Sequence, residues 1–155
     1  MKLLSQTRLV SILKSKRQKK QSIVFTNGCF DILHVGHVRY LKKAKSLGNV
    51  LVVGLNSDAS VRGLKGAGRP VNSERERSEV VAALEFVDYV TIFSQATPLQ
   101  LIQKIRPEYL VKGGDWDKSR IVGSGFVQSY GGKTLSLPFV KGYSTTRVLG
   151  AIRKS

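Results

Sequence analysis

The sequence predicts one doubly wound α/β domain, a Rossmann-like fold with a five-stranded parallel sheet. Three observations support this prediction. Short apolar runs of strand length alternate with helical stretches, the central runs are apolar throughout, and no repeat, linker or low-complexity tract divides the 155 residues. Strands that alternate with helices form parallel sheets with right-handed crossovers, and fully apolar strands lie in sheets covered on both faces.

Five apolar runs are the predicted strands. They span residues 22–26, 50–55, 88–93, 109–111 and 133–137. Their short length and their β-branched and aromatic side chains favour strands over helices. Gly28 and Gly113 follow the first and fourth runs, and glycine is typical of the point where a strand turns into a loop.

Helices are expected before, between and after these strands. They span residues 3–18, 35–47, a stretch that starts at 73, residues 97–106, a stretch near 120–130 and a C-terminal stretch that starts at 144. The first carries apolar side chains at loose helical spacing. Gly48 is expected to close the second in the left-handed backbone that glycine tolerates.

The later helices have capping signals. Ser73 and Glu76 form a capping box ahead of an apolar stretch that includes Val80. Pro98 stands at the first helical position of the next helix, where its missing N–H costs nothing. Ser144 is expected to cap the last helix.

Charge is the unusual bulk property of the chain. Lys and Arg number 26 against 10 acids, which gives a net charge of +16. Such a field attracts nucleic acid, anionic lipid or phosphorylated small molecules, and charge alone does not choose among them. Part of the excess is expected only to solvate the first helix, namely Lys14, Lys16, Arg17, Lys19 and Lys20.

The N-terminal segment, residues 1–21, is expected to be a basic helix in the same domain as residues 22–155. No apolar run approaches the ~20 residues that span a bilayer, and the N-terminus is too polar for a signal peptide. The chain has a single cysteine, which cannot form an internal disulfide. We therefore expect a cytoplasmic protein without stable membrane insertion.

The loop after the first strand, residues 26–31, is the expected binding site. Doubly wound sheets bind ligands beyond the carboxyl ends of their strands. His34 and His37 follow at the start of the next helix with Gly36 between them, where backbone N–H groups and the helix dipole favour anions. Two imidazoles three residues apart face the same side, so they form a donor cluster suited to a phosphoryl group.

Other interpretations of these residues stay open. The two histidines could lie at the surface without a role, or they could bind zinc together with Asp31. Zinc is disfavoured because the sole thiol lies inside the glycine loop and no H-E-x-x-H motif is present. Asp31 could instead cap the following helix, and Cys29 is more typical of a small packing residue than of a nucleophile.

Two motifs carry a family resemblance. The segment Gly28-Cys-Phe-Asp-Ile-Leu-His-Val-Gly-His37 resembles the signature of the cytidylyltransferase-like nucleotidyltransferases, and Ser144-Thr145-Thr146 matches their second signature. Over residues 22–152 the chain is similar to the adenylyltransferases that make ADP-heptose from a heptose 1-phosphate. It departs from them at Ser94-Gln95, where an acidic pair is expected, and in its more basic first helix.

The resemblance implies transfer of AMP from ATP to a sugar 1-phosphate, with pyrophosphate as the second product, for lipopolysaccharide core synthesis. Because a fused sugar-kinase domain is absent, it also implies a separate kinase. Two alternatives stay open. The first is a cytidylyltransferase that acts on glycerol 3-phosphate or a similar small phosphate, and the second is a non-catalytic basic module that binds RNA or anionic lipid.

Roles follow from charge and from the resemblance. The expected catalytic residues are His34, His37 and Lys65. The expected nucleotide-binding residues are Thr26, Asn27, Gly28, Cys29, Phe30, Gly36, Lys112, Gly113, Gly114, Tyr143, Ser144, Thr145, Thr146 and Arg147. The expected residues for the sugar phosphate are Asp31, Asn56, Asp58, Arg69, Asp115 and Trp116. Mg²⁺ is expected to bind mainly through the ATP phosphates, without protein ligands.

Several finer expectations complete the prediction. Residues 63–68 are glycine-rich and follow no strand, so they are expected to form a mobile loop. Trp116 could stack on a ligand or pack against the protein. Backbone groups around Gly113, Gly114 and Tyr143 are expected to read the edge of adenine. A homodimer is expected from the resemblance, and nucleic acid is not expected as a partner.

Overall fold

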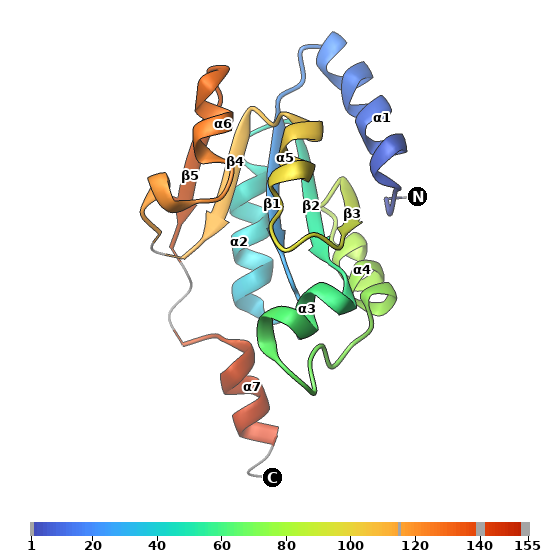
Figure 1. Cartoon of the computed structure of the whole chain (residues 1–155), viewed down its shortest axis with the longest axis vertical. Coiled ribbons are helices and arrows are strands. Elements are labelled where there is room, and N and C mark those ends of the chain that lie inside the picture. Colours follow the sequence, from blue (N-terminus) through green and yellow to red (C-terminus); the bar gives the residue numbers. More distant parts are fainter. Residues whose placement is uncertain (1, 115, 139–141, 153–155) are drawn as a thin grey trace.

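The computed structural model describes residues 2–114, 116–138 and 142–152 (Figure 1). Its strands are β1 (Ile23–Gly28), β2 (Val50–Asn56), β3 (Tyr89–Phe93), β4 (Tyr109–Gly113) and β5 (Lys133–Leu137). Its helices are α1 (Gln6–Gln18), α2 (Val35–Lys45), α3 (Asp58–Lys65), α4 (Glu74–Ala83), α5 (Leu99–Ile105), α6 (Ser124–Ser129) and α7 (Thr145–Ile152), with a 3-10 turn, η1 (Lys118–Arg120).

The five strands form one parallel sheet in the order β3-β2-β1-β4-β5. The predicted five-stranded Rossmann-like sheet is therefore confirmed. The chain leaves β1 toward β2 and β3 on one side, and it returns to β4 and β5 on the other. The strand order reverses between β1 and β4, and at such a point the loops after neighbouring strands diverge and leave room for a ligand.

Two apolar layers cover the sheet, one on each face. Along β1, Ile23 and Phe25 belong to one layer and Val24 to the other, because successive strand side chains point to opposite faces. The first layer is completed by α1, α5 and α6, and the second by α2 and α4. All three side chains are fully buried, as expected for a central parallel strand.

Helix α1 packs on the first layer. Leu9 and Leu13 are fully buried, and the helix contacts α5 and β3. Ahead of it, Leu4 donates its backbone N–H to the carbonyl of Val90, and Val90 donates to the carbonyl of Lys2. These bonds cover the free edge of β3, which would otherwise expose unpaired backbone groups.

Gly48 does not have the predicted role. Helix α2 ends at Lys45, and Gly48 is not among the residues with a positive φ. A Cβ at position 48 would instead lie 2.8 Å from Oγ of Ser22 and 2.8 Å from Cγ2 of Val24. Glycine is needed here because the turn packs against the start of β1, which the local sequence does not reveal.

Part of the predicted mobile loop is helical. Residues 58–65 form α3, so only Gly66 and the residues after it leave the helix, with a φ of 85° at Gly66. The helix starts because the side chain of Ser57 accepts a hydrogen bond from the backbone of Ser60 at 3.2 Å. That cap outweighs the low helix propensity of Gly63.

Two later helices also differ from expectation. The capping box of Ser73 is confirmed, but Val80 is 49% exposed and Arg77 takes a place on the buried face of α4. The predicted helix near 120–130 is split into η1 and α6 by Gly123, whose φ is 88°. A Cβ there would lie 2.8 Å from Cδ1 of Ile102, so packing against α5 sets the break.

Candidate active site

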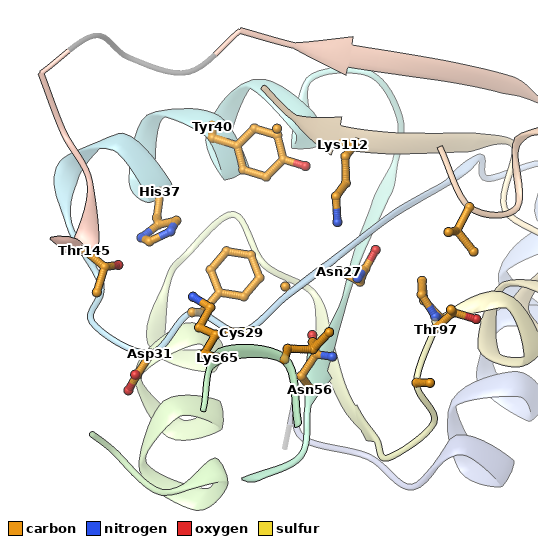
Figure 2. A pocket seen from close by; sticks show the side chains of 17 residues that line it. Asn27, Cys29, Asp31, His37, Tyr40, Asn56, Lys65, Thr97, Lys112 and Thr145 are labelled. Atoms are coloured by element: carbon orange, nitrogen blue, oxygen red, sulfur yellow. The ribbon is translucent and has the colours of Figure 1, made fainter. Parts of the chain in front are cut away.

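A cavity of about 380 Å³ opens at the carboxyl ends of β1, β2 and β4 (Figure 2). The predicted site residues that line it are Asn27, Gly28, Cys29, Phe30, Asp31, His37, Asn56, Lys65, Lys112, Gly113 and Thr145. The other lining residues were not predicted: Tyr40, Leu64, Ala96, Thr97, Pro98 and Val122. The structure thus brings together segments from β1, α2, β2, α3, β4 and α7.

The loop after β1 is shaped by Phe30. Its side chain folds back over Gly28, so that a Cβ at position 28 would lie 2.9 Å from ring atom Cε2 of Phe30. Phe30 has a φ of 45°, which residues other than glycine rarely adopt. Its ring also meets the ring of His37 edge-on, with centroids 5.3 Å apart. Glycine at position 28 is therefore required by the packing of this loop.

His34 and His37 form a stacked pair at the start of α2. Their ring centroids lie 3.9 Å apart with an interplanar angle of 24°. His37 lines the cavity and His34 does not. The Nδ1 atoms of both are buried, and neither has a hydrogen-bond partner in the described part of the chain. Because buried polar atoms are nearly always paired in proteins, these nitrogens point to a ligand.

The environment keeps both imidazoles neutral at pH 7. Burial, together with the charges of His34 and Lys65, lowers the pKa of His37 from 6.5 to about 4. Burial also lowers the pKa of His34. A neutral imidazole offers one N–H donor and one acceptor nitrogen. In the ligand-free protein the pair can therefore donate hydrogen bonds to a phosphoryl group without first carrying charge.

Gly36 brings the two signature motifs together. It is buried, and a Cβ there would lie 3.0 Å from the ring of His34 and 3.3 Å from Cβ of Tyr143. Segments far apart in the sequence thus meet at a position where a side chain would push them apart. Thr145 follows at the start of α7 and lines the cavity near His37 (Figure 2).

The rest of the second motif lies on the exposed first turn of α7. Oγ of Ser144 accepts a hydrogen bond from the backbone of Arg147 at 3.1 Å, which confirms the predicted cap. Arg147 donates from its guanidinium to the carbonyl of Gly142. Tyr143, Thr146 and Arg147 are exposed, and like Ser144 they do not line the cavity.

Two lysines point into the cavity from different elements (Figure 2). Lys112 lies in β4 beside its carboxyl end, and Lys65 is the last residue of α3. Burial lowers the pKa of Lys112. Within the described residues neither ammonium group has a hydrogen-bond or ion-pair partner. The unpaired charge of the half-buried Lys112 is costly, and an anion in the cavity would supply the missing partner.

Asp31 and Arg69, both predicted to contact the substrate, bind each other. Nε of Arg69 lies 2.6 Å from Oδ2 of Asp31, and Oδ1 accepts the backbone N–H groups of Val71 and Asn72. Burial raises the pKa of Asp31, but the hydrogen bonds and the guanidinium outweigh it and lower the value. Asp31 therefore anchors the segment that follows α3, and it does not cap α2.

Asp58 is likewise used inside the protein. It does not line the cavity, and its Oδ1 accepts a hydrogen bond from Nη2 of Arg77 at 2.7 Å. The sequence interpretation missed Arg77. A signal was present, because Arg77 precedes the buried Val81 by four residues and so shares its helix face. Asn56 donates to Oγ of Ser60 at 2.9 Å while lining the cavity.

Backbone groups after β4 are also engaged. The N–H of Gly114 donates to the carbonyl of Leu137, and the indole N–H of Trp116 donates to the carbonyl of Gly113. The N–H of Gly114 is therefore already paired with β5, and the reading of adenine by backbone groups around Gly113, Gly114 and Tyr143 stays a prediction. Trp116 is 50% exposed and lines an adjoining cavity of about 180 Å³. Asp115 lies outside the described residues.

Tyr40 is a lining residue that the sequence interpretation missed. Its hydroxyl donates to the carbonyl of Val111 and lies 2.6 Å from Oγ1 of Thr26, which is buried and does not line the cavity. Burial raises the pKa of Tyr40, so the hydroxyl stays protonated. It ties α2 to β1 and β4 beneath the site. Its spacing of three from His37 was the available signal.

The described residues contain no group of three or more His, Cys, Asp or Glu side chains placed to hold a metal ion. Zinc binding by Asp31, His34 and His37 therefore has no support, since the carboxylate of Asp31 is already occupied. In the same ranges, no helix combines the length and the apolar character needed to cross a bilayer.

Comparisons with known proteins identify the family of the chain. A sequence model of the cytidylyltransferase-like family matches residues 25–148. The bifunctional protein HldE of Geotalea uraniireducens is 54% identical over 145 residues, which are 94% of this chain and 30% of that protein. The chain therefore spans about three tenths of the length of this relative.

Two solved structures share the fold. The lipopolysaccharide core biosynthesis protein of Thermoplasma volcanium aligns with a TM-score of 0.65 and 26% identity, covering 80% of this chain and 99% of that one. The pantoate–β-alanine ligase of Francisella tularensis aligns with a TM-score of 0.65 over 99% of this chain and 77% of its own, at 18% identity. At that identity the second likeness concerns the fold alone.

Proposed function

The chain belongs to the cytidylyltransferase-like family and is a nucleotidyltransferase, and we propose that it transfers AMP from ATP to a heptose 1-phosphate. The products are ADP-heptose and pyrophosphate, and the nucleotide sugar serves lipopolysaccharide core synthesis. The 54% identity with HldE and the likeness to a lipopolysaccharide core biosynthesis protein support this choice. A sugar-kinase reaction supplies the sugar phosphate.

The observation that carries the proposal is the set of unpaired donors around the cavity. His37, whose ring is stacked on that of His34, and the unpaired Lys65 and Lys112 surround a space whose carboxylate, Asp31, is already neutralised by Arg69. No free anion among the described lining residues opposes a triphosphate. Cations and N–H donors placed in this way stabilise charge on phosphoryl oxygens.

The reaction needs little covalent chemistry from the protein. An oxygen of the sugar phosphate is already ionised at neutral pH and attacks the α-phosphorus, so a general base is not required. The bond from the α-phosphorus to the bridging oxygen breaks, and pyrophosphate leaves with the electron pair. His37 donates to the α-phosphate, while Lys65, Lys112 and Thr145 hold the triphosphate in line for attack.

The donor set fits a magnesium ion held mainly by the nucleotide. Because the carboxylate of Asp31 is saturated by Arg69 and backbone N–H groups, the described lining residues offer no free carboxylate ligand. Mg²⁺ keeps several waters and binds readily through phosphates. When bound, it neutralises phosphate charge and favours departure of pyrophosphate.

The test is pyrophosphate release with ATP and with CTP on the same heptose 1-phosphate. We expect ATP to be preferred by at least ~10-fold in kcat/KM, because polar groups of a base pocket left unpaired by the wrong base cost about 1–3 kcal/mol each. The second candidate, a cytidylyltransferase for glycerol 3-phosphate, is favoured by the description of the matching family. Equal or better turnover with CTP would select it and reject the heptose assignment.

A further inference from the structure

Residues 58–72 form an arm that carries Lys65 to the cavity (Figure 2). The middle of the arm, residues 62–68, is exposed throughout. A Cβ added at any of the three glycines in this stretch would meet no atom within 4 Å. Since the middle of the arm packs against so little of the protein, the position of Lys65 is set by the two ends of the arm.

The second end of the arm is tied to the loop after β1. Arg69, Val71 and Asn72 all donate to the carboxylate of Asp31, and Nδ2 of Asn72 also donates to the backbone carbonyl of Asp31 at 2.7 Å. Asp31 has 3% of its surface exposed. Four hydrogen bonds to one buried residue fix this end against the floor of the cavity.

The first end is tied by Arg77 of α4, whose side chain is fully buried. Its Nη2 lies 2.7 Å from Oδ1 of Asp58, the first residue of α3. Its Nη1 donates to the carbonyl of Cys29 at 2.5 Å, and its Nε donates to the carbonyl of Asn72 at 3.0 Å. One guanidinium therefore joins the first end of the arm, its second end and the loop after β1.

We propose that Arg77 is a positioning residue that holds Lys65 over the triphosphate by fixing both ends of the arm to the loop after β1. The identity of the ligand rests on the proposed function, whereas the way in which Arg77 fixes the arm does not. A guanidinium is suited to this place because its planar fork reaches three acceptors in fixed directions. A lysine ammonium at position 77 cannot reach all three, so it would leave buried acceptors unpaired and release the arm.

The first experiment compares Arg77→Lys with Arg75→Lys in pyrophosphate release. Arg75 lies on the same helix, and its side chain is 86% exposed, so its variant is the matched control and stays within about twofold of wild type. We expect Arg77→Lys to lower kcat/KM for ATP by ~30-fold, because small misplacements of positioning groups carry losses of this order. When Lys65 is already replaced by Ala, Arg77→Lys should lower kcat/KM for ATP by less than about threefold.

A second readout does not depend on turnover. Burial is the main cause of the lowered pKa of His37, and the charges of His34 and Lys65 lower it further. With only two histidines in the chain, the imidazole signals can be followed by NMR titration. His34 is the other group that depresses this pKa, and it is unchanged in these variants. We expect Arg77→Lys to raise the pKa of His37, and we expect the same direction for Lys65→Ala. Asp58→Ala, which removes the acceptor of Nη2 of Arg77, should also raise the pKa of His37 and serves if Arg77→Lys does not fold.

Two results would overturn the proposal. One is an equal loss from Arg77→Lys with and without Lys65, since Arg77 would then act on the site by another route. The other is an unchanged pKa of His37 in the folded Arg77 and Asp58 variants. If the wild type turns over no sugar phosphate, the proposed function fails, while the NMR comparison still decides the role of Arg77.

Discussion

The cavity and the first helix are both positively charged, but their cations are in different states. Lys65 and Lys112 point into the cavity without a protein partner in the described chain, and Lys112 is mostly buried. On α1, Arg17 is fully engaged: it donates to Glu108 at 2.9 Å and to the carbonyls of Ile105 and Arg106. Lys14 of that helix is exposed and faces water.

This difference shows that the number of charges does not identify a site. A cation that already has its acceptors stabilises the fold, and one surrounded by water is screened within about 8 Å at physiological ionic strength. An unpaired cation in a cavity, by contrast, gains most of its interaction only when an anion arrives. The net charge of +16 therefore divides into structural, solvating and ligand-binding parts.

The largest effect is expected in the cavity at the two histidines. His37→Ala or His34→Ala should lower kcat by ~10²–10⁴ with a modest change in KM, because the lost donors act mainly in the transition state. Steady-state pyrophosphate release measures this. A variant that keeps more than a third of wild-type turnover would remove that histidine from the mechanism.

A matched pair of lysines compares the two regions directly. Lys112→Met should lower kcat/KM for ATP by ~10–100-fold, because a partly buried charge loses its phosphate partner. Lys14→Met removes the same charge from the exposed face of α1 and should change this value less than about twofold. Equal losses in the two variants would mean that overall charge, rather than the cavity, governs nucleotide binding.

The pH dependence of stability should come from the cavity. The pKa of His37 is about 4 in the folded protein against 6.5 as a free side chain, so the unfolded chain binds this proton more readily. The stabilising effect of a neutral His37 is then complete above pH 6.5 and is lost as the pH falls toward 4. Urea unfolding at several pH values in this range gives the free energy of unfolding. Its fall with decreasing pH should be smaller in His37→Gln than in the wild type. An unchanged slope would place the titrating group elsewhere.

Arg17 should affect stability and leave activity intact. Arg17→Met removes three hydrogen bonds between α1 and the end of α5, and we expect a loss of ~1–3 kcal/mol in the free energy of unfolding. This is a correction to the sequence interpretation, which counted Arg17 among residues that only solvate the helix. Urea denaturation provides the measurement, and a loss of turnover in the folded variant would contradict this assignment.

The smallest effect is expected from four lysines in and directly after the first helix. Lys14, Lys16, Lys19 and Lys20, changed together to Gln, should leave kcat/KM within about twofold at physiological salt, because their attraction for substrates is screened. At low salt the same variant should be slower, which serves as the control for charge steering. Loss of turnover at physiological salt would place this helix near the active site.

Much of the fold could be predicted because its signals are local. Continuous apolar runs identified all five strands, and the capping box of Ser73 and the cap of Ser144 marked two helix starts. Failures arose where a distant segment sets the local structure. A side chain at position 48 would collide with Ser22. A side chain at position 123, where the helix breaks, would collide with Ile102.

By itself the sequence determined the family and the residues that line the cavity from the end of β1, the loop after it and the first turn of α2. It did so because His37 and its neighbours belong to one contiguous loop whose chemistry depends on spacing. Only the tertiary structure decided which charged residues are free. Asp31 and Asp58 carry the right chemistry for a substrate, but their carboxylates are paired with Arg69 and Arg77, whereas Nη2 of Arg69 is buried without a partner among the described residues. A side chain whose acceptors or donors are saturated inside the protein is not available to a ligand, and saturation is a property of the folded chain.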